Sequence, residues 1–412
     1  MAIIVLSGGR FCLEDEVAKA LVAATGLTLL DDAAVVGEAA RLSGKPESQI
    51  WKAFSDSTSV FNKFTMEKEI AIAHMKQVLS NRLTGDSLVI PGYTGLLIPK
   101  AVSHTFRTCL VADISYKTRA AVEKYAIPEK EAAVIINRDD RHRAAWTHTL
   151  TGSKDPIDPS FFDTAIYMDR QSPSEAAKTI MQHAAQPLFQ PSPESRQAVE
   201  DFRLAARVET ALFGEGHHVD VSATSGDVTL VINRHVLMIK QLEDELRATV
   251  EKIDGVKSVA VEAGKNFHKS QVYRKHDFGS PSRVLLVDDE REFAQTLSER
   301  LMIRDVGAAV APNGREALSL IERDPPEVMV IDLKMPDISG MELLKKVKRT
   351  WSEIEVVVLT GHGSDADRET CLNMGAFAYL QKPVEIEELN KMIHQAHRKI
   401  QALEQASGPK MP

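Results

Sequence analysis

The chain has 412 residues, more than a single hydrophobic core usually organises, so we expect two or three domains. Hydrophobic residues make up 43% and charged residues 26%, which is typical of soluble globular proteins. The formal net charge of −8 gives no electrostatic reason to expect nucleic acid as the main partner.

No stretch of the sequence approaches the roughly 18 consecutive apolar residues of a membrane span, and the amino terminus lacks the basic flank and cleavage site of a signal peptide. The three cysteines, Cys12, Cys109 and Cys371, are far apart and have neither metal-ligand spacing nor the pattern of a disulfide framework. We therefore predict a cytoplasmic protein without a transmembrane segment.

Residues 1–187 are predicted to form an α/β domain with a parallel sheet, because apolar runs typical of buried strands alternate with helical patterns. The first run, 3–6, is followed by the sequence Ser-Gly-Gly-Arg at 7–10 and by a helical pattern over 13–24. This is the order of a phosphate-binding loop, in which backbone N–H groups at the start of a helix face an anion. The loop lacks the lysine and the serine or threonine of the full P-loop signature.

Three acidic residues, Glu14, Asp15 and Glu16, follow this loop. They can interact favourably with the positive end of the helix dipole, at about 0.3–1 kcal/mol each. In the same position they would repel the oxygens of a bound triphosphate. We favour the helix-dipole role over a complete triphosphate site.

Four motifs in this region carry a family resemblance: Ser7-Gly8-Gly9-Arg10, Leu30-Asp31-Asp32, Asp139-Asp140-Arg141-His142-Arg143 and Phe162-Asp163-Thr164. Through them residues 1–183 resemble the cytidylate kinase-like family of P-loop proteins, in which arginines of a lid segment hold phosphates. The resemblance implies a nucleotide phosphate site formed by Ser7, Gly8, Gly9, Arg10, Arg138, Arg141 and Arg143. Because a kinase needs a fixed cation and a Mg²⁺ ligand beside the transferring phosphoryl group, the incomplete loop favours a nucleotide-binding or structural relic over an active kinase.

Residues 188–195 are rich in proline, which removes backbone donors and disfavours a preceding helix, so we predict a semi-rigid linker. Residues 196–264 are predicted to form a small α+β unit. Its elements are a helix over 198–212, strands over 219–222 and 228–232, a helix over 236–253 and a strand over 255–261. The αββαβ order and the Gly-Val-x-x-Val sequence at 255–259 resemble the BON domain family, which implies a surface that binds a partner protein or a membrane. The adjacent His217 and His218 are predicted to lie in a solvated turn rather than at a metal site.

A polar and locally basic segment, 265–281, is predicted to be a flexible linker. Beyond it, residues 282–404 contain four apolar runs that lead into polar groups. The runs at 284–287, 328–331, 356–359 and 377–380 lead into Asp288 and Asp289, Asp332, Thr360 and Lys382, respectively. Because the carboxyl ends of neighbouring parallel strands meet at one edge of a sheet, these side chains should converge. Carboxylates are the ligands that Mg²⁺ prefers, and an aspartate can act as a nucleophile toward phosphoryl groups.

The matching features are the acidic pair Asp288-Asp289, the motif Asp332-Leu333-Lys334-Met335-Pro336 closed by Gly340, Thr360, Tyr379, and Lys382-Pro383. Through them residues 283–402 resemble the receiver domain of two-component response regulators, a doubly wound (βα)5 fold. The resemblance implies that Asp332 is phosphorylated, that Lys382 binds the phosphoryl oxygens, and that Thr360 and Tyr379 act as switch residues. It also implies a Mg²⁺ ion held by Asp288, Asp289, Asp332 and the backbone carbonyl of Lys334.

We therefore interpret the chain as a response regulator that accepts a phosphoryl group from a sensor histidine kinase or a phosphotransfer protein. The amino-terminal domain would act as a degenerate nucleotide-binding sensor or as an output module, and the BON-like unit would bind a protein partner. One alternative is an active nucleotide kinase controlled by the receiver, and another is a signalling scaffold without enzymatic output. No DNA-binding domain is evident from the sequence.

The final helix has apolar residues spaced alternately three and four apart: Ile386, Leu389, Ile393, Ala396, Ile400 and Leu403. This spacing is that of a coiled-coil seam, although it is short for one. We expect the first half to cover the receiver sheet and the overhang from about Ala396 to be free to pair, which allows dimerisation. Residues 405–412 are predicted to be a disordered tail.

Overall fold

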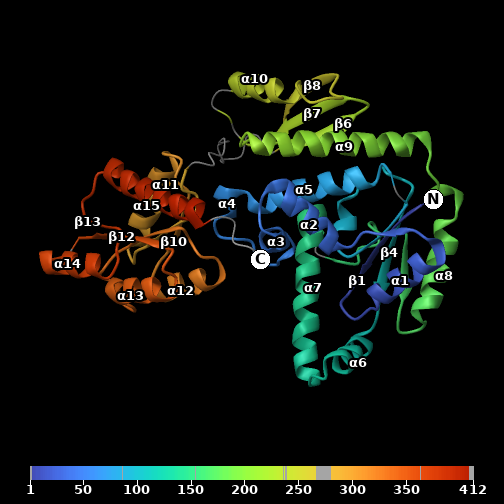
Figure 1. Cartoon of the computed structure of the whole chain (residues 1–412), viewed down its shortest axis with the longest axis horizontal. Coiled ribbons are helices and arrows are strands. Elements are labelled where there is room, and N and C mark those ends of the chain that lie inside the picture. The colour runs from blue at the N-terminus through green and yellow to red at the C-terminus, as the bar shows by residue number, and fades with distance from the viewer. Residues whose placement is uncertain are drawn as a thin grey trace. The chain divides into compact units, whose positions relative to one another are not determined.

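The computed structural model divides the chain into two compact units (Figure 1). The residues that it describes are 2–85, 87–153, 155–234, 236, 239–265, 280–361 and 363–407. The first unit comprises Met1–Thr58 and Glu67–Lys275, and the second comprises Ser59–Met66 and His276–Pro412. Most of the predicted polar linker at 265–281 lies outside the described residues, as do residues 408–412 of the predicted tail.

The first unit is built around a five-stranded parallel sheet, which confirms the predicted α/β class. Its strands are β1 (Ile3–Gly8), β2 (Thr28–Leu29), β3 (Leu88–Pro91), β4 (Thr105–Val111) and β5 (Thr164–Tyr167). They lie in the order β2-β3-β1-β4-β5, and every neighbouring pair is parallel. β1 is central and all of its residues are buried. Its carboxyl end therefore opens at the middle of one sheet edge, where ligands of such sheets gather.

Helices cover both faces of this sheet. They are α1 (Glu14–Thr25), α2 (Asp32–Ser43), α3 (Glu47–Trp51), α5 (Glu67–Arg82), α6 (Ile114–Tyr125), α7 (Glu129–Thr151) and α8 (Pro173–Ala184), with the short 3-10 helices η1 (Lys52–Phe54) and η2 (Thr94–Leu97). Ile4 and Leu6 of β1 share a core with α1 and α8. Ile3 and Val5 share the other core with α2, α5 and α7. This alternation is the two-residue period of a strand that is buried on both faces.

The middle segment of the chain has the predicted order of elements. These are α9 (Pro193–Gly214), β6 (Asp220–Thr224), β7 (Asp227–Ile232), α10 (Ile239–Val250) and β8 (Ser258–Ala263). β7 is central in the three-stranded sheet, antiparallel to β6 and parallel to β8. α9 packs along α5 and contributes Val199 and Phe202 to the core beneath the large sheet. This segment therefore belongs to the first unit.

Two features of this region differ from the sequence-based expectation. The proline-rich segment 188–195 is packed: Phe189 is buried in the core beside α1 and α8, and Pro193 begins α9, since the first helical turn needs no N–H from proline. The His pair is not solvated, because His217 is 1% exposed and its Nε2 lies 3.7 Å from a carboxylate oxygen of Glu245. His218 stacks on the ring of Phe213.

The second unit contains another five-stranded parallel sheet with helices on both faces, which confirms the predicted doubly wound fold. Its strands are β9 (Val284–Val287), β10 (Ala308–Ala311), β11 (Val328–Ile331), β12 (Glu355–Thr360) and β13 (Ala378–Gln381). They lie in the order β10-β9-β11-β12-β13 and are parallel throughout. The four apolar runs of the sequence are thus β9, β11, β12 and β13, and their carboxyl ends share one edge.

The helices of this unit are α4 (Asn62–Thr65), α11 (Arg291–Met302), α12 (Gly314–Arg323), α13 (Gly340–Thr350), α14 (Asp365–Asn373) and α15 (Ile386–Ser407). α12 and α13 pack into one core, and α11 and α15 pack into the other. Ala396 is fully buried and Ile400 packs against the same core. The part of the final helix expected to be free for pairing therefore begins later than Ala396.

Residues Ser59–Met66 belong to the second unit, although the sequence placed them in the first 187 residues. The Phe61 side chain is fully buried in the core that includes α12 and α13. The Arg283 guanidinium lies 4.9 Å from the centre of its ring, and the Ser59 hydroxyl donates a hydrogen bond of 2.6 Å to Asp324. The sheet and its helices therefore share their core with a segment more than 200 residues earlier in the chain.

We expect Phe61→Ala to lower the free energy of unfolding of the second unit by about 3–5 kcal/mol, because it deletes a fully buried aromatic side chain. Hydrogen exchange of peptides from β9 and α12 in denaturant would measure this loss. Ile303→Ala is the control, since that side chain is 67% exposed in the same unit and should change the stability by no more than about 0.5 kcal/mol. Equal stabilities of the two variants would contradict the assignment of Phe61 to this core.

Candidate functional site

The polar groups that follow the strands of the second unit converge at one edge of its sheet. The Lys382 ammonium group lies 2.7 Å from Asp288 Oδ2 and 3.2 Å from Asp332 Oδ2. Asp288, Asp289 and Asp332 offer carboxylate oxygens that all lie within 4.8 Å of one another. Asp288 and Asp332 are 5% and 8% exposed, whereas Asp289 is exposed. The predicted acidic cluster and its lysine are therefore brought together.

The charges of this cluster are held in a partly buried setting. Burial raises the pKa of Asp288, and its hydrogen bond with Lys382 opposes that rise only in part. Burial alone would lower the pKa of Lys382, but the hydrogen bonds and charges of Asp288 and Asp332 outweigh it and raise the pKa. Lys382 is consequently a cation at neutral pH. Three carboxylates around one ammonium group leave an excess of negative charge, which suits a divalent cation.

The loop after β11 is folded tightly beside Asp332. Gly340 approaches the backbone so closely that a Cβ atom there would overlap the carbonyl oxygen of Asp332, and its N–H donates a hydrogen bond of 2.9 Å to the carbonyl of Leu333. Only glycine fits this position. The backbone N–H of Lys334 lies 3.4 Å from Asp332 Oδ1, so Lys334 lies next to the cluster. The role of its carbonyl as a metal ligand stays a prediction.

Thr360 and Tyr379 lie on neighbouring strands near this edge. Thr360 is the last residue of β12 and is fully buried. The Tyr379 side chain lies against Gly363, where a Cβ atom would overlap the phenol oxygen. That oxygen is buried and has no hydrogen-bond partner among the residues that the structure describes. Tyr379 is thus held inward, next to the loop that follows Thr360.

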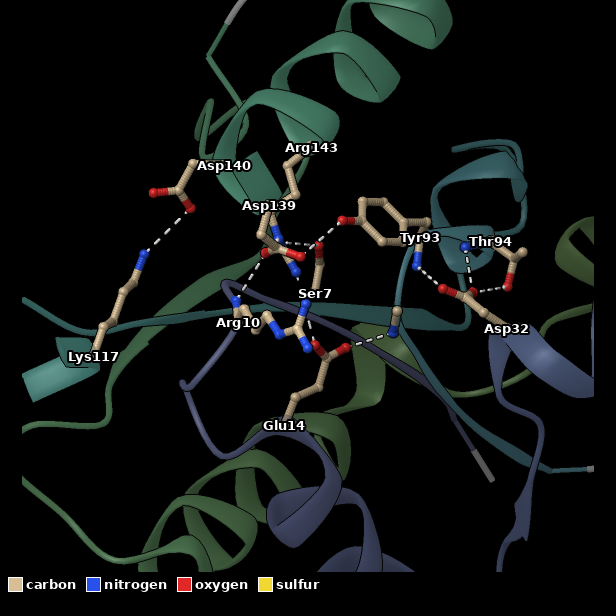
Figure 2. A network of polar contacts seen from close by, with 11 residues as sticks. Ser7, Arg10, Glu14, Asp32, Tyr93, Thr94, Lys117, Asp139, Asp140 and Arg143 are labelled. Carbon is tan, nitrogen blue, oxygen red and sulfur yellow. Dashed lines mark hydrogen bonds and ion pairs between the residues drawn. The ribbon is translucent and has the colours of Figure 1, made fainter. Parts of the chain in front are cut away.

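A second polar network lies at the end of β1 in the first unit (Figure 2). Arg143, which is 7% exposed, reaches from α7 to the loop after β1. Its guanidinium lies 3.7 Å from a carboxylate oxygen of Glu14, 3.4 Å from one of Asp139, and 3.5 Å from the Ser7 hydroxyl oxygen. The backbone N–H of Arg10 donates a hydrogen bond of 3.0 Å to Asp139. The predicted Ser7 and Arg143 therefore meet at the loop.

The other predicted arginines are directed elsewhere. The Arg10 guanidinium donates a hydrogen bond of 2.9 Å to the hydroxyl of Tyr125. Arg141 is two-thirds exposed and pairs with Asp56 at 3.3 Å, and Arg138 is exposed. Of the three lid arginines that the family resemblance implies, the structure places only Arg143 against the loop, because α7 is a continuous helix and residues 138 and 141 lie on other faces of it.

The left-handed backbone of the loop lies at residues other than its glycines. Gly8 and Gly9 do not have positive φ values, while Phe11 and Leu13 have φ values of 69° and 56°, in the left-handed region that favours glycine. Such a conformation costs on the order of 1 kcal/mol or more for a residue with a side chain. Positions 11 and 13 thus have a backbone conformation that suits glycine, although neither residue is a glycine.

Three groups near the loop were not predicted as site residues. Glu14 was expected only to interact with the helix dipole, yet its carboxylate accepts a hydrogen bond of 2.5 Å from the backbone N–H of Gly92. Asp32 accepts hydrogen bonds from both N–H groups of Tyr93 and Thr94. Lys117, from α6, lies beside Gly9, where a Cβ atom would be 2.8 Å from its Nζ. No local sequence pattern identifies these contacts, because their partners are far apart in the chain.

Comparisons with known proteins follow the same division. Residues 284–394 match the family described as the response regulator receiver domain, and residues 3–170 match the cytidylate kinase-like family. Response regulator MprA of Mycolicibacterium vanbaalenii is 38% identical over 109 residues, which are 26% of this chain and 47% of that protein. Transcriptional regulatory protein TrcR of Mycobacterium tuberculosis is 38% identical over 111 residues, 27% of this chain and 43% of that protein. The chain therefore spans less than half the length of these two relatives.

An uncharacterized 14.6 kDa protein of Leptolyngbya boryana is 38% identical over 116 residues, which cover 27% of this chain and 87% of that protein. Among solved structures, a response regulator receiver domain protein from Clostridium thermocellum is 31% identical and covers 29% of this chain and 98% of its own, with a TM-score of 0.29.

The doubly wound sheet and its acidic edge, with these matches, define a receiver domain of the kind found in two-component signalling proteins. The chain belongs to the response regulator receiver family through residues 284–394, and residues 3–170 match the cytidylate kinase-like family. No helix in the described part of the chain is long and apolar enough to cross a membrane.

Proposed function

We propose that the chain is a response regulator whose Asp332 carboxylate accepts a phosphoryl group from a sensor histidine kinase or a phosphotransfer protein. The observation that carries the proposal is the position of Lys382, within hydrogen-bond distance of both Asp288 and Asp332. A carboxylate next to a fixed cation, at the open edge of a parallel sheet, can attack phosphorus while the cation binds the oxygens of the incoming group. Labelling of Asp332 by a small phosphodonor tests this directly.

In the transfer, an oxygen of Asp332 attacks the phosphorus atom of a phosphohistidine. A P–O bond to Asp332 forms while the P–N bond breaks, and the leaving imidazole keeps the electron pair and takes up a proton. The acyl phosphate adds about −1.5 to −2 charges if it resembles other protein phosphates. Lys382 is placed to bind its oxygens, since the ammonium group already lies 3.2 Å from Asp332.

The three carboxylates fit a Mg²⁺ ion, because this cation prefers oxygen ligands from one or two carboxylates together with waters and phosphoryl oxygens. Asp288, Asp289 and Asp332 would hold it, with the Lys334 carbonyl as a further ligand. When bound, the ion would supply positive charge to the phosphoryl oxygens. Lys382 and the ion would then neutralise the acyl phosphate from different sides.

We further propose that Thr360 and Tyr379 form the switch that follows phosphorylation. The Thr360 hydroxyl would be drawn toward the phosphoryl group, and the inward-held Tyr379 would follow the loop around Gly363. The outcome would be a population shift of the face around α14 toward the conformation that a downstream partner binds.

The amino-terminal domain, in this proposal, is a degenerate nucleotide-binding module that senses or transmits rather than catalyses. This is supported by the absence of the P-loop lysine and hydroxyl from the loop sequence and by the carboxylates that surround Arg143. Residues 196–264 would supply a BON-like surface for a protein partner. We place the protein in the cytoplasm, where histidine kinases present their phosphoryl groups to receivers.

Asp289→Ala is expected to weaken Mg²⁺ binding by at least about tenfold. The two remaining carboxylates, Asp288 and Asp332, are already engaged by Lys382 and therefore dehydrate this cation poorly. Isothermal titration of the full chain with Mg²⁺ measures the affinity. Glu299→Ala is a suitable control, since it removes an exposed carboxylate from α11. If both variants bind Mg²⁺ as the parent does, the metal site lies elsewhere.

A further inference from the structure

The loop after β1 already holds an anion that belongs to the chain itself. The Glu14 carboxylate lies next to Gly8 and accepts a hydrogen bond of 2.5 Å from the backbone N–H of Gly92, which also donates to the carbonyl of Leu6 at 3.0 Å. The guanidinium of Arg143 lies 3.7 Å from the Glu14 carboxylate. These groups belong to β1, to the loop after β3 and to α7, and Figure 2 shows the Glu14 carboxylate directed toward Arg143. A backbone N–H group and a buried guanidinium that meet at one carboxylate form an anion-binding site.

Arg143 cannot be satisfied by water, because it is 7% exposed and a buried charge requires a paired partner. The chain provides two carboxylates for it, Glu14 and Asp139. Asp139 also occupies the backbone N–H of Arg10 at 3.0 Å. The donors that a P-loop-like segment offers to phosphate oxygens are thus engaged by side chains of the protein.

These groups line a cavity of about 780 Å³, which is large enough for a small phosphorylated ligand. Its walls include the glycines of the loop, the buried Arg143 and the aromatic ring of Tyr93. Arg143 lies 5.4 Å from the centre of that ring. The cavity therefore combines a fixed buried cation, a backbone donor and an aromatic wall, and the Glu14 carboxylate lies where the cation and the donor meet. Its lining also contains six other acidic residues: Asp15, Glu16, Asp31, Asp32, Glu123 and Asp139.

We propose that Glu14 is a built-in competitor for phosphate in this cavity, so that a phosphate-bearing ligand binds only when the Glu14 carboxylate is neutral or displaced. The inference deepens the proposed role of the amino-terminal domain and rests on it. Glu14 is a positioning residue here: it sets the charge that Arg143 and the loop present to a ligand. The chemical class recognised is a phosphoryl or sulfuryl group, and nucleotides and inorganic anions are distinguished by the experiment.

The protonation of Glu14 makes this competition dependent on pH. Burial raises the pKa of its carboxyl to about 7, against the opposing effect of Arg143, and the nearby Asp32 raises it further. Asp139 from α7 and Tyr93 from the loop after β3 face the same space. Below about pH 7 the carboxyl is neutral and competes poorly, whereas above it the carboxylate holds Arg143. Anion binding should therefore strengthen as the pH falls from 8 to 6.

Cys12 also borders this loop, and it does not reverse the expected sign. Burial raises the pKa of its thiol above the ordinary value of a cysteine, so the thiol is neutral over this pH range. Asp32 is held by the N–H groups of Tyr93 and Thr94 and by the Thr94 hydroxyl. Burial raises the pKa of Asp32 as well, and its protonation would act in the same direction as that of Glu14.

The test is the binding of sulfate to the full chain, because sulfate keeps a constant charge between pH 6 and pH 8. Glu14→Gln keeps the size of the side chain and an oxygen for the Gly92 N–H, but removes the charge. We expect it to bind sulfate on the order of tenfold or more tighter than the parent at pH 8, and to lose most of the dependence on pH. Glu131→Gln is the matched control, since it removes an exposed carboxylate from α7 that does not line the cavity, and it should bind as the parent does.

Equal sulfate affinity of Glu14→Gln and the parent at pH 8 would overturn the proposal. If the variant unfolds, the parent alone still decides, since sulfate affinity that does not rise from pH 8 to pH 6 contradicts it. Arg143→Met in the Glu14→Gln chain should abolish the gained binding. Parallel titrations with inorganic phosphate, ATP and CMP then separate the sources: an equal gain for all points to the phosphoryl group alone, and a larger gain for one nucleotide points to recognition of its base. A gain for sulfate without any for nucleotides would leave Glu14 as a competitor for anions and contradict the nucleotide-binding role proposed for the domain.

Discussion

Asp332→Asn is expected to abolish covalent labelling of the chain by acetyl phosphate while leaving the fold intact. Asp332 is 8% exposed and accepts a hydrogen bond from Lys382. Asparagine has the same shape and keeps an oxygen for that hydrogen bond, but its amide is not a nucleophile toward phosphorus. The effect should be a complete loss rather than a graded one, because the covalent bond itself is removed. Intact-mass spectrometry of the chain with Mg²⁺ and acetyl phosphate measures it.

The control for this experiment is Asp337→Asn. Asp337 lies in the loop after β11, and its carboxylate accepts hydrogen bonds from the backbone N–H groups of Gly314 and Arg315. These hydrogen bonds connect Asp337 to α12 rather than to Lys382 or Asp288, so labelling should persist. Hydroxylamine should release the label from the parent chain, because an acyl phosphate is a mixed anhydride. Undiminished labelling of Asp332→Asn, or a label that survives acid, would mean that another residue is the nucleophile.

The receiver site could be predicted from the sequence because its geometry follows from strand periodicity. Each apolar run ends at the last residue of its strand or one residue before it, and parallel strands deliver the polar groups that follow to one edge. Asp288, Asp332 and Lys382 therefore meet although they are 44 to 94 residues apart. The pattern did not show how far along α15 the contact with the sheet extends. The same apolar spacing occurs in a helix that covers a sheet and in a helix that forms a coiled-coil seam.

The amino-terminal site was predicted less completely, because its contacts depend on how loops close over long distances in the sequence. Glu14 was assigned to the dipole of its own helix, which is a local effect. Its partners Gly92 and Arg143 lie 78 and 129 residues away, and no periodic pattern connects them. The left-handed backbone of Phe11 and Leu13 could not be predicted either, because neither residue type favours that conformation.

The segment Ser59–Met66 was missed for a related reason. It is only eight residues long, so the spacing of its apolar residues Val60, Phe61, Phe64 and Met66 is too short a pattern to establish a helix or strand period. The proline-rich segment 188–195 was predicted to be a linker, because proline is disfavoured in a helix interior. Pro193 instead occupies the first turn of α9, where its missing N–H has no consequence.

The full chain is expected to form no CDP above background from CMP, ATP and Mg²⁺. Phosphoryl transfer by a kinase depends on positioning and on positive charge at the γ-phosphoryl oxygens. In this chain the loop lacks the lysine and the hydroxyl of the P-loop, and Glu14 takes the hydrogen bond of the Gly92 N–H. Removing one well-placed electrostatic group typically lowers a rate by a factor of about 10²–10³. Two such losses, together with a carboxylate at the anion position, should leave turnover close to that of the uncatalysed reaction.

Separation of nucleotides by chromatography measures CDP and ADP in this assay, and it distinguishes transfer to CMP from hydrolysis of ATP. The Asp332→Asn chain should be run in parallel, because it removes any consumption of phosphoryl groups by the receiver. Lys117 lies beside Gly9, where it could replace the missing lysine, and its Nζ is paired with Asp140 at 3.4 Å. Should CDP form at about 1–100 per second, the ordinary range of kinases, Lys117→Met is the variant to examine, and the active nucleotide kinase becomes the better account of this domain. Binding of ATP or CMP without CDP supports the sensor role, whereas no binding of either at any pH favours the scaffold.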